Sequence, residues 1–393
     1  MKIVYVAEDV HKHAGVPRCV AELVERMAFD NEVVVISRHL SDIHHNGVRF
    51  YKIPTLGTYF FRSITFLLAA NLVLAYLIYV RREHFDIIHS TASDGGFFAN
   101  AVTFHFCARE GLEWERYQPK RLPIRWYHFL RTLNHFSYRY LAVWIESFIM
   151  KKRPQVLVTI SQRSIADFSK HYGTTAENMR VITHGVNADR FHPRNQERDR
   201  LPVRARHGIG AEEIVLLFVG GDWERKGLDT LLAALALLPS NAKLLVVGHG
   251  DMPLYQNEAR ALHVGERVIF AGRSEAVEEY FAAADVFVLP SLYEPYGLVI
   301  SEAMASGLPV ITSASAGAAQ MIEDGVSGLL LESPPDHREL VAHITSLLCD
   351  ASFREHMGAR ARAAAEAHTW DAAAKAYYAL YNAVLATNCG SNT

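Results

Sequence analysis

Short runs of apolar, often β-branched residues alternate with longer stretches of helical periodicity along most of the chain. In the first half these runs predict strands at Ile3–Ala7, Glu32–Ser37, Val48–Ile53, Asp86–His89, Val102–Phe106, Val156–Ile160 and Val181–His184. The helical pattern separates most of them, at Arg18–Phe29, Phe60–Arg82, Ile124–Met150 and Ser161–Tyr172. Such alternation predicts an α/β fold with a parallel sheet covered by helices on both faces.

The stretch FHPRNQERDRLPVRARHGIG (residues 191–210) is polar and contains proline, which predicts a linker. Alternation then restarts, with strands predicted at Ile214–Gly220, Lys243–Gly248, Val268–Gly272, Val286–Pro290, Pro309–Thr312 and Gly328–Leu331. Helices are predicted around Leu228–Leu238, Glu275–Ala284, Leu298–Ser306 and Asp336–Cys349. A chain of 393 residues also exceeds what one core usually supports. We therefore predict two Rossmann-like domains, residues 1–192 and 203–368, with a ligand at the carboxyl ends of the strands.

One apolar run, Phe60–Val80, has the length of a membrane span. Arg62 and Asn71 interrupt it, and it lies where a crossover helix is needed between two predicted strands. A true span would split the first sheet across a bilayer. We therefore favour a buried or partly interfacial helix over a span.

Charge is distributed unevenly: residues 1–200 carry 27 Lys and Arg against 19 Asp and Glu, whereas residues 201–393 carry 13 against 23. Basic residues concentrate among aromatic ones in Lys120–Arg153, where Glu146 is the one acid. This mixture favours peripheral binding to anionic lipid over nucleic acid. A core helix with a solvated basic face is the alternative.

The cysteines and the first residues of the sequence indicate the cellular compartment. The four cysteines are far apart and have no C-x-x-C spacing, which suits a reducing cytosol and argues against a structural zinc site. The start MKIVYVAEDV runs directly into a strand, without the pattern of an export signal. We expect a cytoplasmic protein associated peripherally with the inner face of the membrane.

The segment SLYEPYGLVISEAMASGLPVIT (residues 291–312) holds the most informative chemistry. Glu294 and Glu302 stand eight positions apart, around a glycine-containing turn that opens a helix. The backbone N–H groups of Gly297, Leu298 and Val299 are thereby available to an anion. A carboxylate one turn into this helix is placed to bind a ribose diol, and the other to hold sugar hydroxyls. Ordinary capping acids at a helix N-terminus are the alternative.

This segment resembles the E-x7-E block of the family 4 glycosyltransferases with the GT-B fold, whose two Rossmann-like domains face each other across a cleft. Other stretches resemble the same family in order along the chain: AGVPRCVAELVERMA, DIIHS, VTFHF, VITHGVNADRFHP, FVGGDWERKGLDTLLAALALLP, LLVVGHGDM and VIFAGRSEAVEEYFAAADVFVLPS. The RKG and ISQRSIADFSKHYG stretches look most like the lipopolysaccharide-core glucosyltransferases. The resemblance implies a first domain that binds the acceptor and a second that binds a nucleotide-sugar. It also implies a C-terminal helix, about residues 370–386, packed back on the first domain.

The resemblance also implies roles for the matching residues. Arg225 and Lys226 would pair with the donor diphosphate and neutralise charge as the nucleotide leaves. Glu302 would hold the ribose and Glu294 the donor hexose. We expect Lys226 to face an open cleft.

Three further positions come from the same resemblance. Gly15 would let its loop approach the diphosphate closely, since it has no Cβ. His105 would sit beside the reacting sugar and acceptor, and Arg273 would border the base, although a surface charge is an equal interpretation for Arg273. His89 is expected to be structural, because any one of twenty histidines is more often structural than functional.

Departures from the family pattern and missing motifs bound the mechanism. Gly220-Gly221-Asp222 stands where many members carry an arginine, and Gln320 stands where a glutamate is usual. The sequence has no D-x-D acid pair of the kind that holds a diphosphate through a divalent metal, so we expect no metal and no other cofactor. It also has no G-x-x-x-x-G-K-[ST] phosphate loop.

The resemblance implies a retaining hexosyltransferase that moves a hexose, glucose above all, from a UDP-sugar to a glycan or glycolipid of the bacterial envelope. A GT-B enzyme with a soluble small-molecule acceptor is the alternative. A dinucleotide-binding protein is a third, but it needs G-x-G-x-x-G after the first strand, and only Gly15 is found there.

Overall fold

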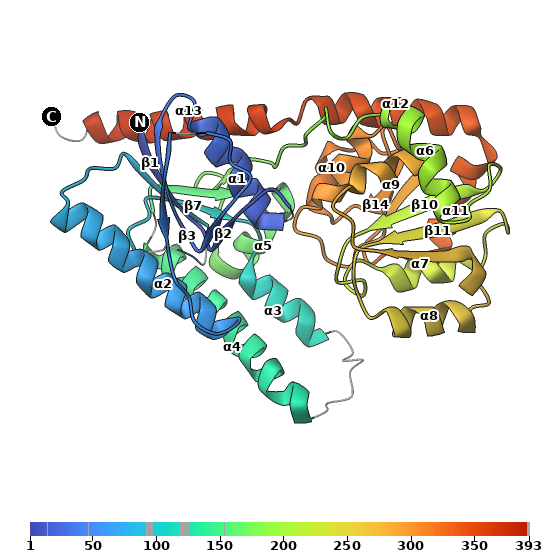
Figure 1. Cartoon of the computed structure of the whole chain (residues 1–393), viewed down its shortest axis with the longest axis horizontal. Helices are drawn as coiled ribbons and strands as arrows, with labels where there is room; N and C mark the ends of the chain where they lie inside the picture. Colours follow the sequence, from blue (N-terminus) through green and yellow to red (C-terminus); the bar gives the residue numbers. More distant parts are fainter. Residues whose placement is uncertain are drawn as a thin grey trace. The chain divides into compact units, whose positions relative to one another are not determined.

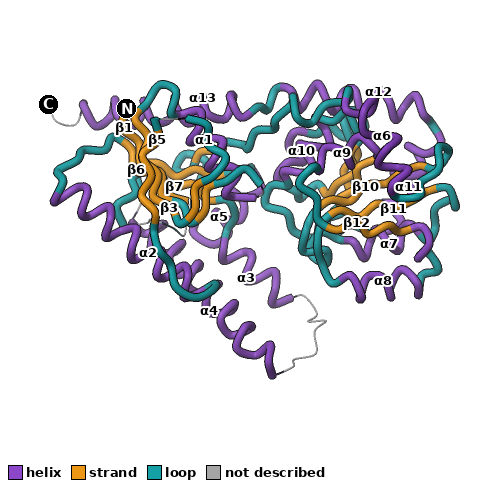
Figure 2. Tube along the Cα trace, viewed as in Figure 1, coloured by secondary structure: helices purple, strands orange, loops and turns teal. Residues whose placement is uncertain are grey.

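The computed structural model describes the backbone of residues 1–13, 15–45, 47–91, 94, 97–117, 126–152 and 154–390. It divides into two units, each with its own parallel sheet between helices (Figures 1 and 2). Unit 1 is Met1–Thr183 together with Trp370–Thr393, and unit 2 is His184–Thr369. Two α/β units of this kind confirm the predicted fold class.

Unit 1 is built on a seven-stranded sheet in the order β5-β3-β1-β6-β7-β8-β9, in which every pair is parallel. The strands are β1 (Lys2–Val6), β3 (Glu32–Ser37), β5 (Val48–Lys52), β6 (Ile87–Thr91), β7 (Ala101–Phe104), β8 (Val156–Thr159) and β9 (Arg180–Val181). A small separate pair is formed by β2 (Asp9–Val10) and β4 (His39–Leu40). The helices are α1 (Gly15–Met27), α2 (Phe60–Ala75), the π-helical turn η1 (Tyr76–Val80), α3 (Ala108–Tyr117), α4 (Trp126–Lys152), α5 (Gln162–Tyr172) and α13 (Trp370–Gly390).

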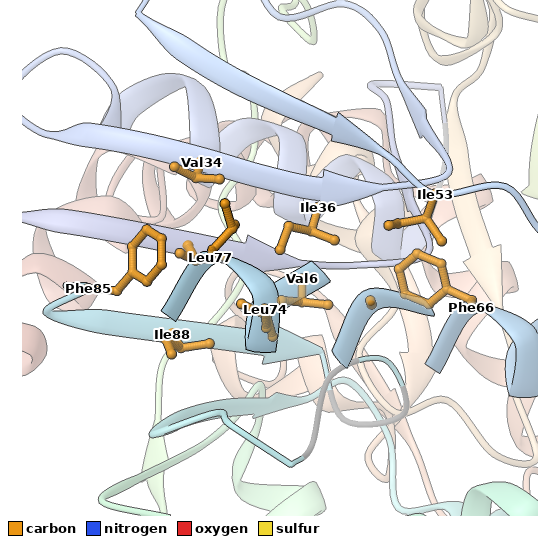
Figure 3. Close-up of a cluster of buried hydrophobic side chains, with 11 residues drawn as sticks. Val6, Val34, Ile36, Ile53, Phe66, Leu74, Leu77, Phe85 and Ile88 are labelled. Carbon is orange, nitrogen blue, oxygen red and sulfur yellow. The ribbon is translucent and has the colours of Figure 1, made fainter. Parts of the chain in front are cut away.

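Helix α2 covers the middle of this sheet. Figure 3 shows Phe66, Leu74 and Leu77 of α2 and η1 facing Val6 and Ile36 of the strands. All of these side chains are almost wholly buried. The burial of such apolar surface is the main stabilising contribution to the unit, and it fixes α2 on the sheet.

Unit 2 has a six-stranded parallel sheet in the order β12-β11-β10-β13-β14-β15. The strands are β10 (Ile214–Val219), β11 (Ala242–Val247), β12 (Val268–Gly272), β13 (Val286–Leu289), β14 (Val310–Ser313) and β15 (Leu329–Leu331). Its helices are α6 (Asn195–Arg206), α7 (Leu228–Leu235), α8 (Met252–Ala261), η2 (Gly265–Arg267), α9 (Val277–Ala283), α10 (Leu298–Ala305), η3 (Gly317–Met321), α11 (His337–Cys349) and α12 (Ala351–Glu366).

The prediction of a linker at residues 191–210 is wrong, because the segment contains a helix. Residues 195–206 form helix α6, which packs on α9 within unit 2, and the unit begins at His184 rather than after residue 192. Arg204 is buried, and its Nη2 lies 2.6 Å from Asp285 Oδ2, while Arg200 Nη2 lies 2.6 Å from the other oxygen of the same carboxylate. A helix anchored by paired arginines has a linker's polar composition, so composition alone could not reveal it.

The apolar run Phe60–Val80 is only about one-third buried. Among the described residues one helical segment, Phe60–Val80, is apolar and long enough to cross a membrane, and 33% of its most apolar window is buried. The basic segment Lys120–Arg153 lies largely in helix α4, but Lys120, Arg121, Arg125 and Arg153 are outside the described residues. The side chain of Arg131 is outside them as well.

Candidate active site

In each sheet the strand order reverses at one point, and we call the carboxyl edge of the sheet at this point its crevice, since α/β folds bind ligands there. In unit 2 the order reverses between β10 and β13, so the loops that follow these two strands diverge to opposite faces of the sheet. The loop after β10 carries Arg225 and Lys226, and the loop after β13 carries Glu294. Two segments almost seventy residues apart in sequence thus meet at the carboxyl edge of the sheet.

A buried ion pair joins these two loops. Lys226 Nζ donates a hydrogen bond to Glu294 Oε2 over 2.6 Å, and the two side chains are 10% and 9% exposed. This corrects the expectation that Lys226 faces an open cleft, because its ammonium group is already bound to the carboxylate. Charges buried this far need partners, and each of the two supplies the other's.

Arg225 reinforces the same junction. Its Nη1 donates to the Tyr293 carbonyl oxygen over 2.6 Å and lies 3.5 Å from Glu294 Oε2. Its Nε donates to Asp222 Oδ2 over 2.7 Å. The planar guanidinium is therefore held at one edge by Asp222 and at the other by the loop after β13. Asp222 was noted in the sequence only as part of a departure from the family pattern, and this orienting role was missed.

The electrostatics of the junction favour a charged Glu294. Burial alone would raise the pKa of this carboxyl group, but Lys226 and then Arg225 outweigh burial and hold the pKa below its ordinary value. Glu294 is therefore an ionised hydrogen-bond acceptor at neutral pH. The charges of Lys226 and Arg225 are balanced by Glu294 and Asp222, but the cations keep N–H groups that these bonds do not use, which suits an anionic ligand.

Two glycines let the backbone close around the pair. Gly220 has a φ of +145°, and a Cβ there would lie 2.7 Å from Lys226 Cε. A Cβ on Gly317 would lie 2.0 Å from the Pro295 carbonyl oxygen, and the Gly317 N–H donates to the Glu294 carbonyl oxygen over 3.0 Å. Side chains at either position would displace the ion pair or its loop. The sequence signal for Gly317 was the altered G-x-P-E element, whose Gln320 lies exposed in η3.

Helix α10 brings the second glutamate of the E-x7-E pair to the same edge. Gly297 precedes the helix with a φ of +95°, and Leu298 and Val299 open it, so their N–H groups have no acceptor within the helix. Glu302 follows one turn later and is 5% exposed. The start of α10 thus offers backbone donors and a carboxylate next to the loop that holds Glu294.

The other predicted site residues lie on other elements of the two units. Arg273 follows β12, three strands from β13, and is exposed with no ion pair among the described residues, as a surface charge would be. Gly15 and His105 belong to unit 1. Gly15 begins α1 with a φ of +60°, and His105 follows β7, where burial lowers its pKa to about 4. His105 is therefore a neutral imidazole at physiological pH.

Unit 1 has its own crevice, between β1 and β6, which the sequence did not indicate. Glu8 follows β1 and Asp94 follows β6, and the Glu8 N–H donates to Asp94 Oδ2 over 2.8 Å. Arg62 of α2 is ion-paired with Glu8. Burial, then the charge of Asp94, raises the pKa of Glu8. Two carboxylates and one guanidinium are a suitable set for sugar hydroxyls.

His89 of β6 is structural, as expected. It is 4% exposed, is hydrogen-bonded to Tyr381 of α13 and lies 2.8 Å from Thr103 Oγ1 through its Nε2. Thr103 Oγ1 is also 2.9 Å from Tyr377 of α13. These bonds attach the C-terminal helix to the sheet of unit 1, and burial lowers the pKa of His89 to about 3.

Comparison with known proteins defines the class. Residues 13–190 match a family described as Glycosyltransferase Family 4, and residues 199–364 match one described as Glycosyl transferases group 1. The chain belongs to the glycosyltransferases that combine these two domains in the GT-B fold. This confirms the family indicated by the sequence.

Particular relatives sharpen the picture. The chain is 33% identical over 230 residues to "Lipopolysaccharide glucosyltransferase WaaG" of Escherichia coli (strain K12). This alignment covers 57% of this chain and 61% of that protein. The chain therefore spans less than two thirds of the length of that relative. A crystal structure of WaaG, described as involved in lipopolysaccharide biosynthesis, superposes with a TM-score of 0.75 at 24% identity and covers 96% of this chain and 98% of that one. Anabaena Alr3699/HepE in complex with UDP gives a TM-score of 0.72 at 19% identity, covering 98% and 100%. The two solved structures establish the fold.

Proposed function

We propose that this protein is a retaining hexosyltransferase that moves glucose from UDP-glucose to a glycan or glycolipid of the bacterial envelope. The observation that carries the proposal is the Lys226–Glu294 pair at the crevice of unit 2, with Arg225 3.5 Å from the same carboxylate. The likeness to a lipopolysaccharide glucosyltransferase supports the hexose and the acceptor, and the UDP-bound neighbour supports the nucleotide.

The chemistry follows from the charges at this junction. Breaking the bond between the sugar and the diphosphate leaves negative charge on the departing oxygen, which Arg225 and Lys226 are placed to stabilise. Lys226 has three donors and uses one on Glu294, so it can bind phosphate without releasing the carboxylate. Glu294, kept ionised, accepts hydrogen bonds from the hexose hydroxyls, and Glu302 accepts those of the ribose. These protein cations take the part that a divalent metal plays elsewhere, so the reaction needs no metal.

The acceptor is assigned to unit 1. Its crevice offers Glu8, Asp94 and Arg62 for sugar hydroxyls. His105, a neutral imidazole, lies in the same unit after β7 and serves as a hydrogen-bond donor or acceptor to the reacting hydroxyl. An envelope glycolipid would reach this crevice from the inner face of the cytoplasmic membrane, where we place the protein as a peripheral enzyme.

A donor screen tests this function. The protein is incubated with UDP-, GDP- and ADP-linked glucose and galactose, and slow hydrolysis is followed in the presence of EDTA. UDP-glucose should be the preferred substrate, and NMR of the transfer product should show the anomeric configuration of the donor. Transfer to a soluble sugar phosphate but not to envelope glycolipid would support the alternative acceptor class. Absence of hydrolysis of every nucleotide-sugar, with or without acceptor, would overturn the proposal.

A further inference from the structure

Helix α2 and the turn η1 have two apolar faces, and only one of them is covered. The buried face contributes Phe66, Leu74 and Leu77 to the core of unit 1 (Figure 3). On the other side, six large apolar side chains are each between 50% and 71% exposed. We call this set the α2 stripe: Phe61, Leu68, Leu72, Tyr76, Tyr79 and Val80.

The α2 stripe makes the solvent-facing side of this helix apolar, whereas an ordinary surface helix has a polar face there. Its spacing of seven, four, four and three residues from Phe61 to Tyr79 places the side chains along one line of the helix. No charged residue occurs between Arg62 and Arg81. Single exposed apolar side chains are common, but a continuous line of six marks a surface that is covered in the working protein.

Aromatic contacts extend this surface beyond the helix. The ring of Tyr79 lies 6.3 Å from that of Phe98. The neighbouring Phe97 is exposed and lies 5.3 Å from Phe148 of α4, which stacks on the exposed Trp144 at 6.2 Å. Aromatic side chains that are partly exposed to water are typical of the membrane–water interface.

The charges at the end of this surface have one sign. Arg81 and Arg82 follow the stripe directly, are exposed and have no ion-pair partner among the described residues. At the end of α4, the exposed Lys152 donates to the Phe97 carbonyl oxygen. The acid next to the arginines, Glu83, is bound to Lys2 and Arg49. Apolar, aromatic and then basic residues are the order that an anionic leaflet selects.

We propose that the α2 stripe is the surface by which this protein docks on an anionic lipid bilayer. The helix lies in the interfacial plane and does not span the bilayer, because its other face is part of the core beneath the sheet. This inference deepens the proposed function, since it rests on an acceptor that is embedded in a membrane. It moves the main contact from the basic segment Lys120–Arg153 to the stripe, with the cations as secondary contributors.

Vesicle sedimentation with paired variants tests the proposal. The full chain is mixed with vesicles of 70% phosphatidylcholine and 30% phosphatidylglycerol. The double variant L68Q/L72Q should bind about 10- to 100-fold more weakly than wild type, since two leucines lose their transfer from water to lipid. The control L201Q/L237Q changes two leucines of unit 2 that are 73% and 61% exposed, and it should bind within about twofold of wild type.

An environment-sensitive dye at Leu72→Cys gives a second readout, after Cys349 and Cys389 are replaced by serine. Its emission should shift to the blue on phosphatidylglycerol vesicles and be quenched by brominated acyl chains. UDP-glucose hydrolysis without acceptor is measured in parallel and should be the same in L68Q/L72Q and wild type. If the wild-type protein does not hydrolyse UDP-glucose, the proposed function fails, whatever the result of vesicle binding.

Several results would overturn the docking proposal. Wild type that ignores the vesicles, or L68Q/L72Q that binds them as wild type does, removes the stripe from membrane contact. A wild-type dimer in lipid-free solution that L68Q/L72Q converts to monomer makes the stripe a protein interface. Binding that resists carbonate means that α2 leaves the core and inserts.

Discussion

The two units share a strand order over six strands, to which unit 1 adds a seventh, and they differ in the chemistry at the point where the order reverses. Between β10 and β13 of unit 2, two cations meet one buried carboxylate. Between β1 and β6 of unit 1, Arg62 is ion-paired with Glu8, whose N–H binds a second carboxylate, that of Asp94. The fold provides the same crevice twice, and the loop residues decide what each crevice binds. Cations with N–H groups to spare suit a diphosphate, whereas acceptor-rich carboxylates suit neutral sugar hydroxyls.

The largest expected effect is the loss of the cation in unit 2. Lys226→Ala should lower turnover on UDP-glucose by about 100- to 1,000-fold, because a preorganised charge no longer meets the leaving diphosphate. Turnover is measured with saturating donor, after circular dichroism has shown that the variant is folded. Turnover equal to wild type would refute the assignment of this crevice to the diphosphate.

The same change should also destabilise unit 2, because it leaves Glu294 buried beside Arg225 alone. Removing one partner of a buried pair costs about 3–5 kcal/mol. With Arg225 still 3.5 Å away we expect roughly 2–3 kcal/mol from urea unfolding. The double variant K226M/E294Q removes both charges and should recover most of this stability while remaining inactive. If K226M/E294Q is no more stable than Lys226→Ala, the pair does not provide the coupling described here.

A substitution in the crevice of unit 1 should change acceptor binding alone. Glu8→Gln removes one carboxylate and should raise the KM for the acceptor by about tenfold, the loss of one charge-assisted hydrogen bond. Hydrolysis of UDP-glucose without acceptor should not change. The matched control is Asp30→Asn, an exposed acid of the same unit. A Glu8→Gln enzyme with altered hydrolysis and an unaltered acceptor KM would reverse the assignment of the two crevices.

The last effect concerns acid stability. His89 has a pKa of about 3 in the folded chain, below the ordinary 6.5, so between these values the unfolded chain binds a proton that the folded chain does not. Stability should therefore fall as pH drops below 6.5, by about 1.4 kcal/mol per pH unit for this one group. Hydrogen exchange of the β1 and β6 amides between pH 6.5 and 4.5 measures the slope. His89→Gln should flatten it and the exposed His356→Gln should not; equal slopes in both variants would contradict the assignment.

Much of the fold could be predicted from sequence, and the reason is visible in particular strands. Glu32–Ser37 and Val268–Gly272 have the predicted bounds, because β-branched runs between polar turns are a local signal. Helix α6 was missed because two of its three buried residues, Asp199 and Arg204, are charged, and Arg204 depends on Asp285, a partner 81 residues away. An ion pair between residues far apart in the sequence produces no periodic pattern of apolar and polar positions.

The site shows the same limit. The family resemblance indicated Arg225, Lys226, Glu294 and Glu302 as candidates, but no pattern in the chain pairs Lys226 with Glu294, 68 positions apart. Nor did it locate Glu8 and Asp94, which the topology brings together after β1 and β6. Likewise the length of Phe60–Val80 was plain, but which of its faces is covered depends on packing.

The central claim is that unit 2 binds a nucleoside diphosphate through protein cations. Calorimetric titration with UDP, in buffer containing excess EDTA, tests it most directly. Wild type should bind UDP with an affinity that added Mg²⁺ or Mn²⁺ leaves within about twofold, and Lys226→Ala should bind about 10- to 100-fold more weakly, as for the loss of one charge-assisted contact. UDP binding that vanishes with EDTA and returns with metal, or that is unchanged in Lys226→Ala, would contradict the account.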